Sequence, residues 1–461
     1  MGTKKDMKES NYKPKILFAG PIGFMSGYGE HARYIFNILL ENQDKYDLYL
    51  APTSWANASF NLQKLFSPDQ IQLIHSLSQK TAAHVNDGKS TTTRKFDLAL
   101  HVAVPNEWDI ENLADKFIGI TAGLETDMCS LEWMQQIFRT DEVWVVSNHA
   151  KKTFKKTLSA SIKNQRKFYG HEGEMPDKAA GFAVRDKFLD QNVKVIGFPS
   201  KRYAEETRDS LDLNLSTKFN FLSINQMGPR KNVETLVADF LRTFKDNPDV
   251  GLVLKSHMQN HSVPDKFLCE KILKHWVQLA IGNDEYKCSL YLLHGNLDPA
   301  EMNSLYHHKD IHCYVSPTHG EGFGLPLYEA ACAGMPIVTV PWSGHMDFLD
   351  LNDSKGYLFE RIRYMIQPVG AKADRQYISP ENNWAVAAPG ATGKAMKNTY
   401  EAYKPKQRQA EKLQKIILNE KQFQIEDIGE RIVQNIDNLV GGLKEEYSSR
   451  RTKDLLATLG S

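Results

Sequence analysis

The sequence has few cysteines, and none of them forms a pair with metal-binding spacing. Five cysteines occur in 461 residues, at positions 129, 269, 288, 313 and 332. Because Cys-x-x-Cys pairs are absent, we expect buried, reduced thiols rather than a zinc site or a disulfide framework. No stretch approaches the ~18 consecutive apolar residues of a membrane-spanning helix, and residues 1–15 lack the apolar core of a signal peptide. These absences predict a cytoplasmic protein, with peripheral attachment to a membrane surface as the alternative.

An excess of charge of one sign is also missing. The chain has 57 Lys and Arg against 56 Asp and Glu, a net charge of +1, so its composition does not indicate a polyanionic partner. Residues 151–170 are a local exception, with seven Lys or Arg and no acid. Ordinary solvated helices mix both signs, so this stretch suggests an anionic acceptor, although a basic exposed helix is the simpler interpretation.

β-rich runs alternate with helical patterns along the first half. The first run, residues 15–20, is followed by a glycine-rich loop and an amphipathic helical pattern at residues 31–42. Further strands are expected at residues 47–51, 97–104, 117–123, 142–147 and 193–198. Such alternation predicts a parallel sheet covered by helices on both faces, and the opening βα unit is Rossmann-like.

The same pattern restarts after a polar, charge-rich segment at residues 199–218. Strands are predicted at 219–224, 250–255, 289–295, 310–316 and 337–340, with an amphipathic helix at 233–244. The chain beyond residue 391 is mostly helical in pattern. We therefore predict Rossmann-like domains at residues 1–200 and 213–390 and a helical segment at 391–461.

The most informative segment is Thr318–Val340, THGEGFGLPLYEAACAGMPIVTV. Glu321 and Glu329 stand on either side of a Gly-Phe-Gly turn that leads into a helix. The N-terminus of a helix favours an anion through its free N–H groups and its dipole. Carboxylates on both sides of the anion can accept hydrogen bonds from hydroxyls. A phosphate with hydroxyls at both ends is the pattern of a nucleotide sugar.

This segment resembles the E-x7-E motif of family 4 of the retaining glycosyltransferases, which have the GT-B fold. The matching positions are Pro317, Glu321, Gly322, Phe323, Gly324, Leu325, Pro326, Glu329, Ala330, Gly334 and Pro336. The resemblance implies an α/β fold with two Rossmann-like domains facing across a cleft and a C-terminal helix that crosses back. It also implies that Glu321 contacts the donor sugar, that Glu329 contacts the ribose, and that the backbone of Gly322, Phe323, Gly324 and Leu325 lies against the sugar and diphosphate.

Arg230 and Lys231 follow the first predicted strand of the second half. Two cations beside a helix N-terminus suit a diphosphate, and the resembled family carries a basic pair here for that purpose. The chain contains no Asp-x-Asp pair that could hold a metal ion on the diphosphate. We therefore expect no metal and no cofactor, and we assign the positive charge at the diphosphate to these two side chains.

The first half offers less specific candidates. His101 falls where a strand should end, at the edge of the sheet where ligands of such folds bind, so it is a candidate catalytic residue. Gly27 and Gly29 belong to a loop that could approach the donor, or could simply be a flexible turn. Glu125 is a candidate acceptor-side residue with helix capping as the alternative. Lys255 and His257 follow a second-half strand; a solvated strand end is the favoured interpretation, and lining the cleft is the alternative.

Taken with the resemblance, these residues predict a glycosyltransferase that transfers a sugar from a nucleoside-diphosphate donor to an acceptor hydroxyl, with retention. The expected acceptor is a glycan or a lipid-linked glycan; the alternative is an anionic acceptor such as a hydroxymethylated base in DNA. A phosphorylase-like enzyme would need a lysine-bound pyridoxal site, which nothing marks. A noncatalytic nucleotide-sugar or nucleic-acid binding protein is the alternative from another class.

Overall fold

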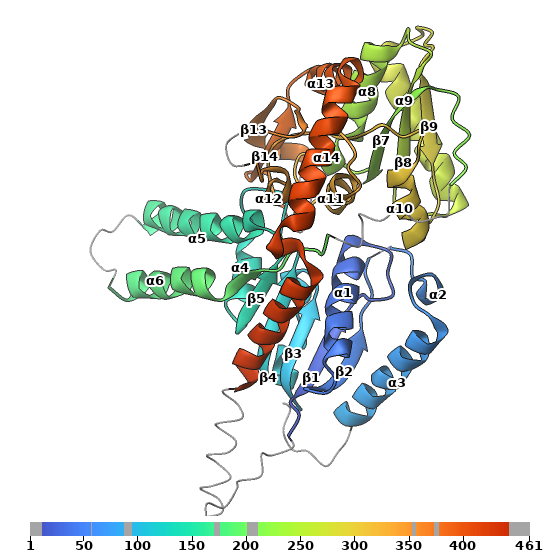
Figure 1. Ribbon diagram of the computed structural model, residues 1–461. Coiled ribbons are helices and arrows are strands. Elements are labelled where there is room, and N and C mark those ends of the chain that lie inside the picture. Colours follow the sequence, from blue (N-terminus) through green and yellow to red (C-terminus); the bar gives the residue numbers. More distant parts are fainter. Residues whose placement is uncertain are drawn as a thin grey trace, which may run out of the picture.

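Two six-stranded sheets form the framework of the protein (Figure 1). The computed structural model describes residues 12–56, 58–86, 95–169, 176–200, 211–352, 356–372 and 378–441. The strand pairs within both sheets are parallel, which confirms the predicted fold class of two Rossmann-like domains. The predicted boundaries at residues 200 and 213 fall between the last strand of the first sheet and the first strand of the second.

The first sheet has the order β2-β1-β3-β4-β5-β6. Its strands are β1 (Lys15–Gly20), β2 (Asp47–Pro52), β3 (Phe96–Val102), β4 (Ala114–Thr121), β5 (Glu142–Val145) and β6 (Val193–Val195). Strands β1, β3 and β5 are buried along nearly their whole length, as expected for a parallel sheet with both faces covered. The helices of this domain are α1 (Gly27–Glu41), α2 (Leu62–Leu65), α3 (Pro68–Val85), α4 (Leu131–Ile137), α5 (Asn148–Tyr169) and α6 (Pro176–Gln191).

The second sheet has the order β12-β11-β10-β7-β8-β9. Its strands are β7 (Phe219–Gln226), β8 (Val250–His257), β9 (Ser289–Leu293), β10 (Cys313–Ser316), β11 (Ile337–Thr339) and β12 (Glu360–Arg361). The helices that follow these strands are α8 (Val233–Phe244), α9 (Val263–Ile281), α10 (Pro299–His307), α11 (Leu325–Cys332), α12 (Met346–Leu349), α13 (Ala391–Glu401) and α14 (Tyr403–Asn419). Helix α8 coincides with the amphipathic pattern predicted for residues 233–244, and Leu236, Val237 and Phe240 are buried on its inner face.

The end of the chain returns to the first domain, as the fold class implies. After α14, residues 425–441 form a further helix that lies over the first sheet (Figure 1). Ile428, Ile432 and Ile436 of this helix are fully buried in a hydrophobic cluster that contains residues of both domains. The hydroxyl of Tyr46 donates to Asp437 over 2.8 Å, which fixes the helix against β2. The C-terminal helix therefore ties the two domains together.

An antiparallel hairpin was missed by the sequence analysis. Strands β13 (Tyr364–Pro368) and β14 (Asn383–Ala387) pair antiparallel outside both sheets. The backbone and side-chain N–H groups of Asn383 donate to the Asp127 carboxylate of the first domain, at 2.7 and 3.0 Å. Trp384 is buried in the core of the first domain as well. The hairpin is thus a second connection between the domains.

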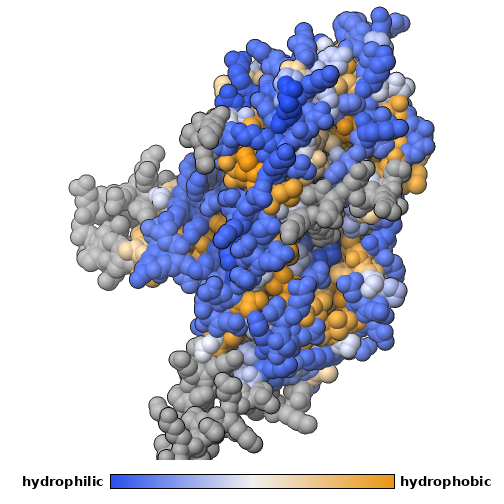
Figure 2. Space-filling model, viewed as in Figure 1, coloured by the Kyte–Doolittle hydropathy of each residue, from blue (hydrophilic) through white to orange (hydrophobic). Residues whose placement is uncertain are grey.

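The face seen in Figure 2 is mostly hydrophilic, with hydrophobic residues visible in patches between polar side chains. Within the described residues, no helix combines the length and the apolar character that a bilayer-crossing segment requires.

Candidate active site

The two predicted groups of charged residues meet at the carboxyl edge of the second sheet. Strands β7 and β10 are neighbours, so the loops that follow them leave the sheet side by side. The loop after β7 carries Arg230 and Lys231, and the loop after β10 carries Glu321. The loops are joined directly, because the N–H of His319 donates to the carbonyl of Arg230 over 2.9 Å. Sheet topology therefore brings together residues that are about ninety positions apart in the chain.

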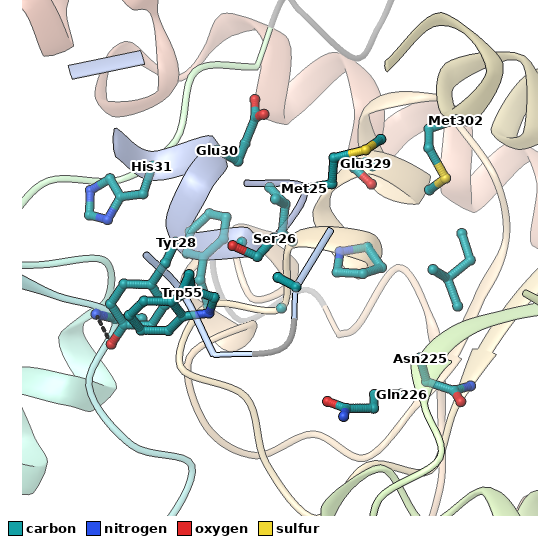
Figure 3. A pocket seen from close by; sticks show the side chains of 18 of the residues that line it. Met25, Ser26, Tyr28, Glu30, His31, Trp55, Asn225, Gln226, Met302 and Glu329 are labelled. Carbon is teal, nitrogen blue, oxygen red and sulfur yellow. Dashed lines mark hydrogen bonds between the residues drawn. The ribbon is translucent and has the colours of Figure 1, made fainter. Parts of the chain in front are cut away.

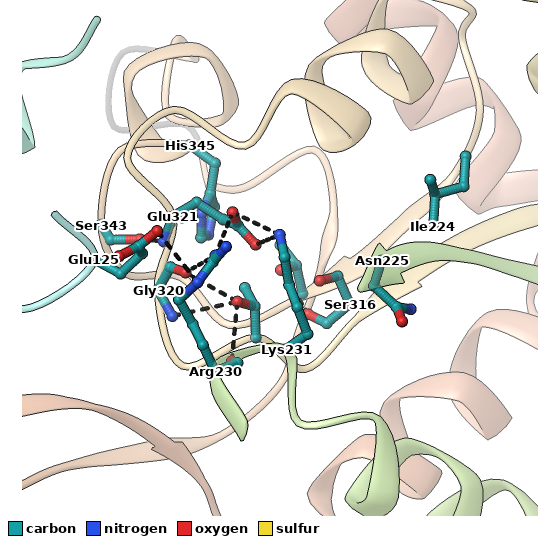
Figure 4. A network of polar contacts seen from close by, with 12 residues as sticks. Glu125, Ile224, Asn225, Arg230, Lys231, Ser316, Gly320, Glu321, Ser343 and His345 are labelled. Carbon is teal, nitrogen blue, oxygen red and sulfur yellow. Dashed lines mark hydrogen bonds and ion pairs between the residues drawn. The ribbon is translucent and has the colours of Figure 1, made fainter. Parts of the chain in front are cut away.

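Glu321 lies between the two cations (Figure 4). Lys231 Nζ donates to both carboxylate oxygens, at 2.6 and 2.8 Å, and Arg230 Nη1 donates to Oε2 over 2.9 Å. The backbone N–H of Glu321 donates to Ser343 Oγ over 2.8 Å, which fixes the start of the turn. These contacts hold one carboxylate and two cations in a single cluster inside the protein.

Electrostatics favour the ionised forms of Glu321 and Arg230, whereas burial and the neighbouring Arg230 lower the pKa of Lys231. Burial by itself would raise the pKa of Glu321, but Lys231 and Arg230 outweigh it and lower the pKa to about 2. Charge-assisted hydrogen bonds of this kind are the strong ones in proteins, at roughly 1.5–3 kcal/mol each. A doubly charged anion that binds the cations must therefore replace the carboxylate of Glu321 as their partner.

The turn after Glu321, residues 322–325, leads into α11 and lines the cavity between the domains. Gly324 is the N-cap of α11 and has φ +88°, a left-handed conformation that favours glycine. The Phe323 ring is buried against Phe198 of the first domain, with ring centroids 4.9 Å apart. One turn into α11, Glu329 accepts a hydrogen bond from the Tyr306 hydroxyl over 2.5 Å. The predicted donor-binding residues 322–325 and Glu329 therefore lie together around one helix N-terminus.

Two glycines allow the first domain to approach this turn. A Cβ added at Gly320 would lie 2.3 Å from the Glu125 carbonyl oxygen, and one at Gly322 would lie 2.6 Å from the Ala122 carbonyl oxygen. The approach places the Glu125 carboxylate 3.2 Å from Arg230 Nε across the domain boundary. Glu125, predicted as an acceptor-side residue, is therefore paired with a cation of the second domain.

Alanine at Gly320 is expected to separate the domains at the site. Its methyl group would collide with backbone atoms of Glu125, which cannot move without shifting the loop. We expect transfer activity to fall at least tenfold and the radius of gyration in small-angle X-ray scattering to increase. Gly228→Ala is the matched control, since a Cβ there meets no atom of the described residues within 4 Å. Unchanged activity of Gly320→Ala would show that the close approach is dispensable.

Residues of both domains line a cavity of about 700 Å³ next to the charged cluster. The first domain contributes the loop before α1, the loop after β2 and the loop after β4. The second domain contributes the loops after β7, β8, β9 and β10 together with α10 and α11. Figure 3 shows α1 and Trp55 on one side of this cavity and Asn225 and Gln226 on the other. Sequence analysis missed Trp55, which stacks on Tyr28 with ring centroids 3.9 Å apart. Its position just after β2, at the carboxyl end of a parallel strand, could have indicated a place near the binding site.

The first-half candidates have different outcomes. Gly27 lines the cavity at the start of α1, whose N-cap is Ser26. Gly29 is required for packing instead, because a Cβ there would lie 2.0 Å from the Phe24 carbonyl oxygen. His101 ends β3 as expected but is buried and is not among the residues that line the cavity. Its Nδ1 lies 3.6 Å from Asp109, and burial lowers its pKa to about 4. The structure does not bring His101 to the charged cluster.

The expectation that Lys255 and His257 are solvated is wrong. Both residues line the cavity, and Lys255 is only 6% exposed. Lys255 Nζ donates to the carbonyl of Gly295 over 2.7 Å, and burial lowers its pKa to about 8. The strand end is covered because the loop after β9 folds over it, an arrangement that the local sequence pattern could not indicate.

The basic stretch at residues 151–170 falls largely on α5, and none of its described side chains, up to residue 161, lines the cavity. Several of its lysines have local partners: Lys155 pairs with Asp190, and Lys156 pairs with Asp127. Lys151 donates to two backbone carbonyls, at 2.8 Å each. Side chains from residue 162 onward lie outside the described part of the chain. An anionic acceptor bound by this stretch stays a prediction.

Comparison with known proteins shows similarity to glycosyltransferases. Residues 205–363 match the family model described as Glycosyl transferases group 1. A protein described as a probable sucrose-phosphate synthase from Thermosipho melanesiensis is 26% identical over 151 residues. The match covers 32% of this chain and 32% of that protein, so the chain spans only about a third of this relative's length.

Solved structures share the fold over nearly the whole chain. Anabaena HepE, in complex with UDP and glucose, superposes with a TM-score of 0.52 at 12% identity, covering 92% of this chain and 100% of that chain. Sucrose-phosphate synthase from Thermosynechococcus elongatus superposes with a TM-score of 0.54 at 12% identity, covering 93% and 100%. The predicted GT-B fold is thereby confirmed. Assignment to family 4 stays a prediction.

Proposed function

We propose that the protein is a glycosyltransferase that moves a sugar from a nucleoside-diphosphate donor to an acceptor hydroxyl with retention of configuration. The observation that carries this proposal is the convergence of Arg230, Lys231 and Glu321 at the entrance to α11, beside a cavity lined by both domains. The cavity volume of about 700 Å³ suits a small-molecule substrate. The two cations can bind the phosphate end of a sugar–phosphate bond, and the carboxylate of Glu321 can accept hydrogen bonds from the hydroxyls at the sugar end.

The charged cluster gives the donor a way to bind. In the free protein the Glu321 carboxylate forms ion pairs with Arg230 and Lys231. An incoming diphosphate offers these cations more charge and more acceptor oxygens than one carboxylate does. Glu321 would then turn to the sugar, where its oxygens accept hydrogen bonds from hydroxyl groups. Glu329 is positioned by Tyr306 to accept hydrogen bonds from the ribose in the same way.

The chemistry follows from where charge develops. The bond between the anomeric carbon and the diphosphate oxygen breaks, and its electron pair leaves on the diphosphate. Arg230, Lys231 and the N-terminus of α11 stabilise this growing negative charge, which is the largest contribution expected from preorganised groups. The acceptor oxygen bonds to the anomeric carbon on the same face, and its proton passes to the departing phosphate oxygen. His101 has no role in this scheme.

A glycan is the acceptor that we favour. Trp55 and Tyr28 form a stacked aromatic pair on the first-domain side of the cavity. An aromatic face packs well against the apolar face of a sugar ring and excludes water from it. A hydroxymethylated DNA base remains the alternative acceptor, since a base extruded from the duplex could stack on the same pair.

A panel of nucleotide sugars tests the proposal. UDP-sugars are the first probes because HepE, which has the same fold, is described in complex with UDP-glucose. The matching donor should raise the melting temperature and should release nucleotide slowly without an acceptor, and faster with a glycan. Binding without any release would favour a noncatalytic binding protein.

Added Mg²⁺ should leave the transfer rate unchanged, because side chains supply the positive charge at the diphosphate. A Mg²⁺-dependent rate would contradict this part of the proposal.

A further inference from the structure

A buried cluster of potential metal ligands lies where two loops of the second domain meet. Asp265 and Cys269 are one turn apart on α9, so both side chains project from the same face of the helix. His294 comes from another part of the chain, directly after the edge strand β9. The loops before α9 and after β9 both contribute residues to the cavity, including Asn260 and Asn296. The cluster thus connects two segments of the cavity wall.

The three side chains are close enough to share one ion. His294 Nε2 lies 3.0 Å from Asp265 Oδ2, and Cys269 Sγ lies 3.8 Å from the same oxygen. One ligand atom from each residue lies within 4.8 Å of the others. The side chains of Asp265 and His294 are only 4% exposed, and Cys269 is fully buried. Tetrahedral zinc has ligands at ~2.0–2.3 Å, so small side-chain movements would bring all three into contact with a central ion.

A fourth group stands beside these three. His261 lies in the loop before α9, and its ring centroid is 5.8 Å from that of His294. Its Nδ1 atom is buried and has no hydrogen-bond partner among the residues that the structure describes. A buried polar atom without a partner is unfavourable unless a ligand or water satisfies it. His261 also packs on His257, with ring centroids 4.2 Å apart. It is the candidate fourth donor, and its ring would reach the ion by turning toward His294.

We propose that Asp265, Cys269, His294 and His261 form a structural site for a divalent transition-metal ion, with Zn²⁺ as the first candidate. Imidazole, thiolate and carboxylate together are the donor set that zinc prefers. On binding, the Cys269 thiol loses its proton to solvent and His294 binds through Nε2 as the neutral ring. The expectation of no metal was based on sequence spacing, which cannot reveal ligands that the fold brings together from residues 261–294.

The same carboxylate also has a plain structural role, which the metal would not displace. Asp265 accepts hydrogen bonds from the N–H groups of Met258 and Gln259, at 3.1 and 2.9 Å. A carboxylate has about four lone-pair positions, and backbone hydrogen bonds to the remaining ones are typical support for a metal ligand. The ion would hold the loop before α9 and the loop after β9 in fixed positions. The site is separate from the diphosphate cluster, and the proposal does not depend on transferase activity.

Direct metal binding to the whole protein tests this proposal. Metal-free protein should bind one equivalent of Zn²⁺ with a rise in melting temperature, and Co²⁺ should give a thiolate charge-transfer absorption. Cys269→Ser should lose that absorption and bind Zn²⁺ at least tenfold more weakly. Cys288→Ser is the matched control, because Cys288 is also a buried thiol of this domain but lies outside the cluster. Its metal binding should equal that of the wild type.

A second variant keeps the test valid if Cys269→Ser fails to fold. His261 is partly exposed, so His261→Ala should keep the melting temperature of the metal-free protein while weakening Zn²⁺ binding at least tenfold. Wild-type protein that binds no stoichiometric Zn²⁺ and gives no cobalt–thiolate absorption would overturn the proposal. Equal Zn²⁺ affinity of the wild type and both cluster variants would overturn it as well.

Discussion

Glutamine in place of Glu321 is expected to reduce sugar transfer by two orders of magnitude or more while leaving nucleotide binding intact or tighter. Glu321 is the anion that occupies Arg230 and Lys231 in the free protein, so it competes with the donor diphosphate. Removing its charge ends that competition. The same change removes the carboxylate that orients the sugar, and loss of one well-placed polar group in a transition state lowers rates by ~10²–10³. The transfer rate should therefore fall, while the nucleotide affinity measured by calorimetry stays the same or rises.

Stability gives an independent measurement of the same cluster. Without the carboxylate, Glu125 is the one acidic partner left to the two cations among the described residues, so the free variant should melt at a lower temperature than the wild type. Saturating nucleotide should recover most of that loss, because the diphosphate takes over the missing charge. Glu360→Gln is the matched control: Glu360 pairs with Lys406 over 2.6 Å in the same domain, outside the cavity lining. Nucleotide should raise the melting temperature of Glu360→Gln by the same amount as that of the wild type. The stability deficit of this variant should therefore persist at saturating nucleotide, and its transfer rate should equal that of the wild type. A wild-type transfer rate for Glu321→Gln would refute the assigned role.

Much of this site could be predicted because it depends on sheet topology. Ligands of parallel α/β sheets bind at the carboxyl edge, and the strands before Arg230 and Glu321 could be located from their apolar runs. The glycines around Glu321 marked a turn into a helix. The structure adds the reason for two of them: Gly320 and Gly322 allow close contact with the first domain. That reason depends on the arrangement of two domains, which a local pattern does not contain.

The parts that could not be predicted depend on contacts between segments far apart in the chain. His101 is at the predicted strand end, but the segment after β3 covers it, with Asp109 3.6 Å from its ring. Lys255 ends a strand too, and the loop after β9 buries it. The hairpin β13–β14 was missed because its strands are separated by a long segment rather than by a tight turn with a sequence signal. For His101 and Lys255 the strand was identified and the segment that covers its end was not, whereas the strands of the hairpin were not identified at all.

Neutral residues in place of both cations are expected to produce the largest loss of donor affinity. Each charge-assisted hydrogen bond contributes roughly 1.5–3 kcal/mol, so Arg230→Gln combined with Lys231→Met should weaken nucleotide binding by ~10²–10⁴-fold at about 1.4 kcal/mol per tenfold. Calorimetry with the donor nucleotide measures this directly. Lys406→Met is the matched control, since Lys406 pairs with Glu360 at a similar depth in the same domain. Wild-type affinity of the double variant would remove both residues from the donor site.

The double variant should bind the diphosphate weakly for two reasons: the attraction of the two cations is lost, and the unpaired Glu321 carboxylate repels the diphosphate. The pH dependence of binding separates these two effects. In the wild type the two cations hold the pKa of Glu321 at about 2, so this carboxylate stays ionised throughout the neutral and mildly acidic range. Without them, burial is the dominant effect left and raises the pKa of Glu321 above its ordinary value. Lowering the pH should then neutralise Glu321, remove its repulsion of the diphosphate, and recover part of the lost affinity. Wild-type protein should show no such gain from Glu321. If adding Glu321→Gln to the double variant leaves that pH dependence unchanged, then Glu321 is not the group that opposes the diphosphate.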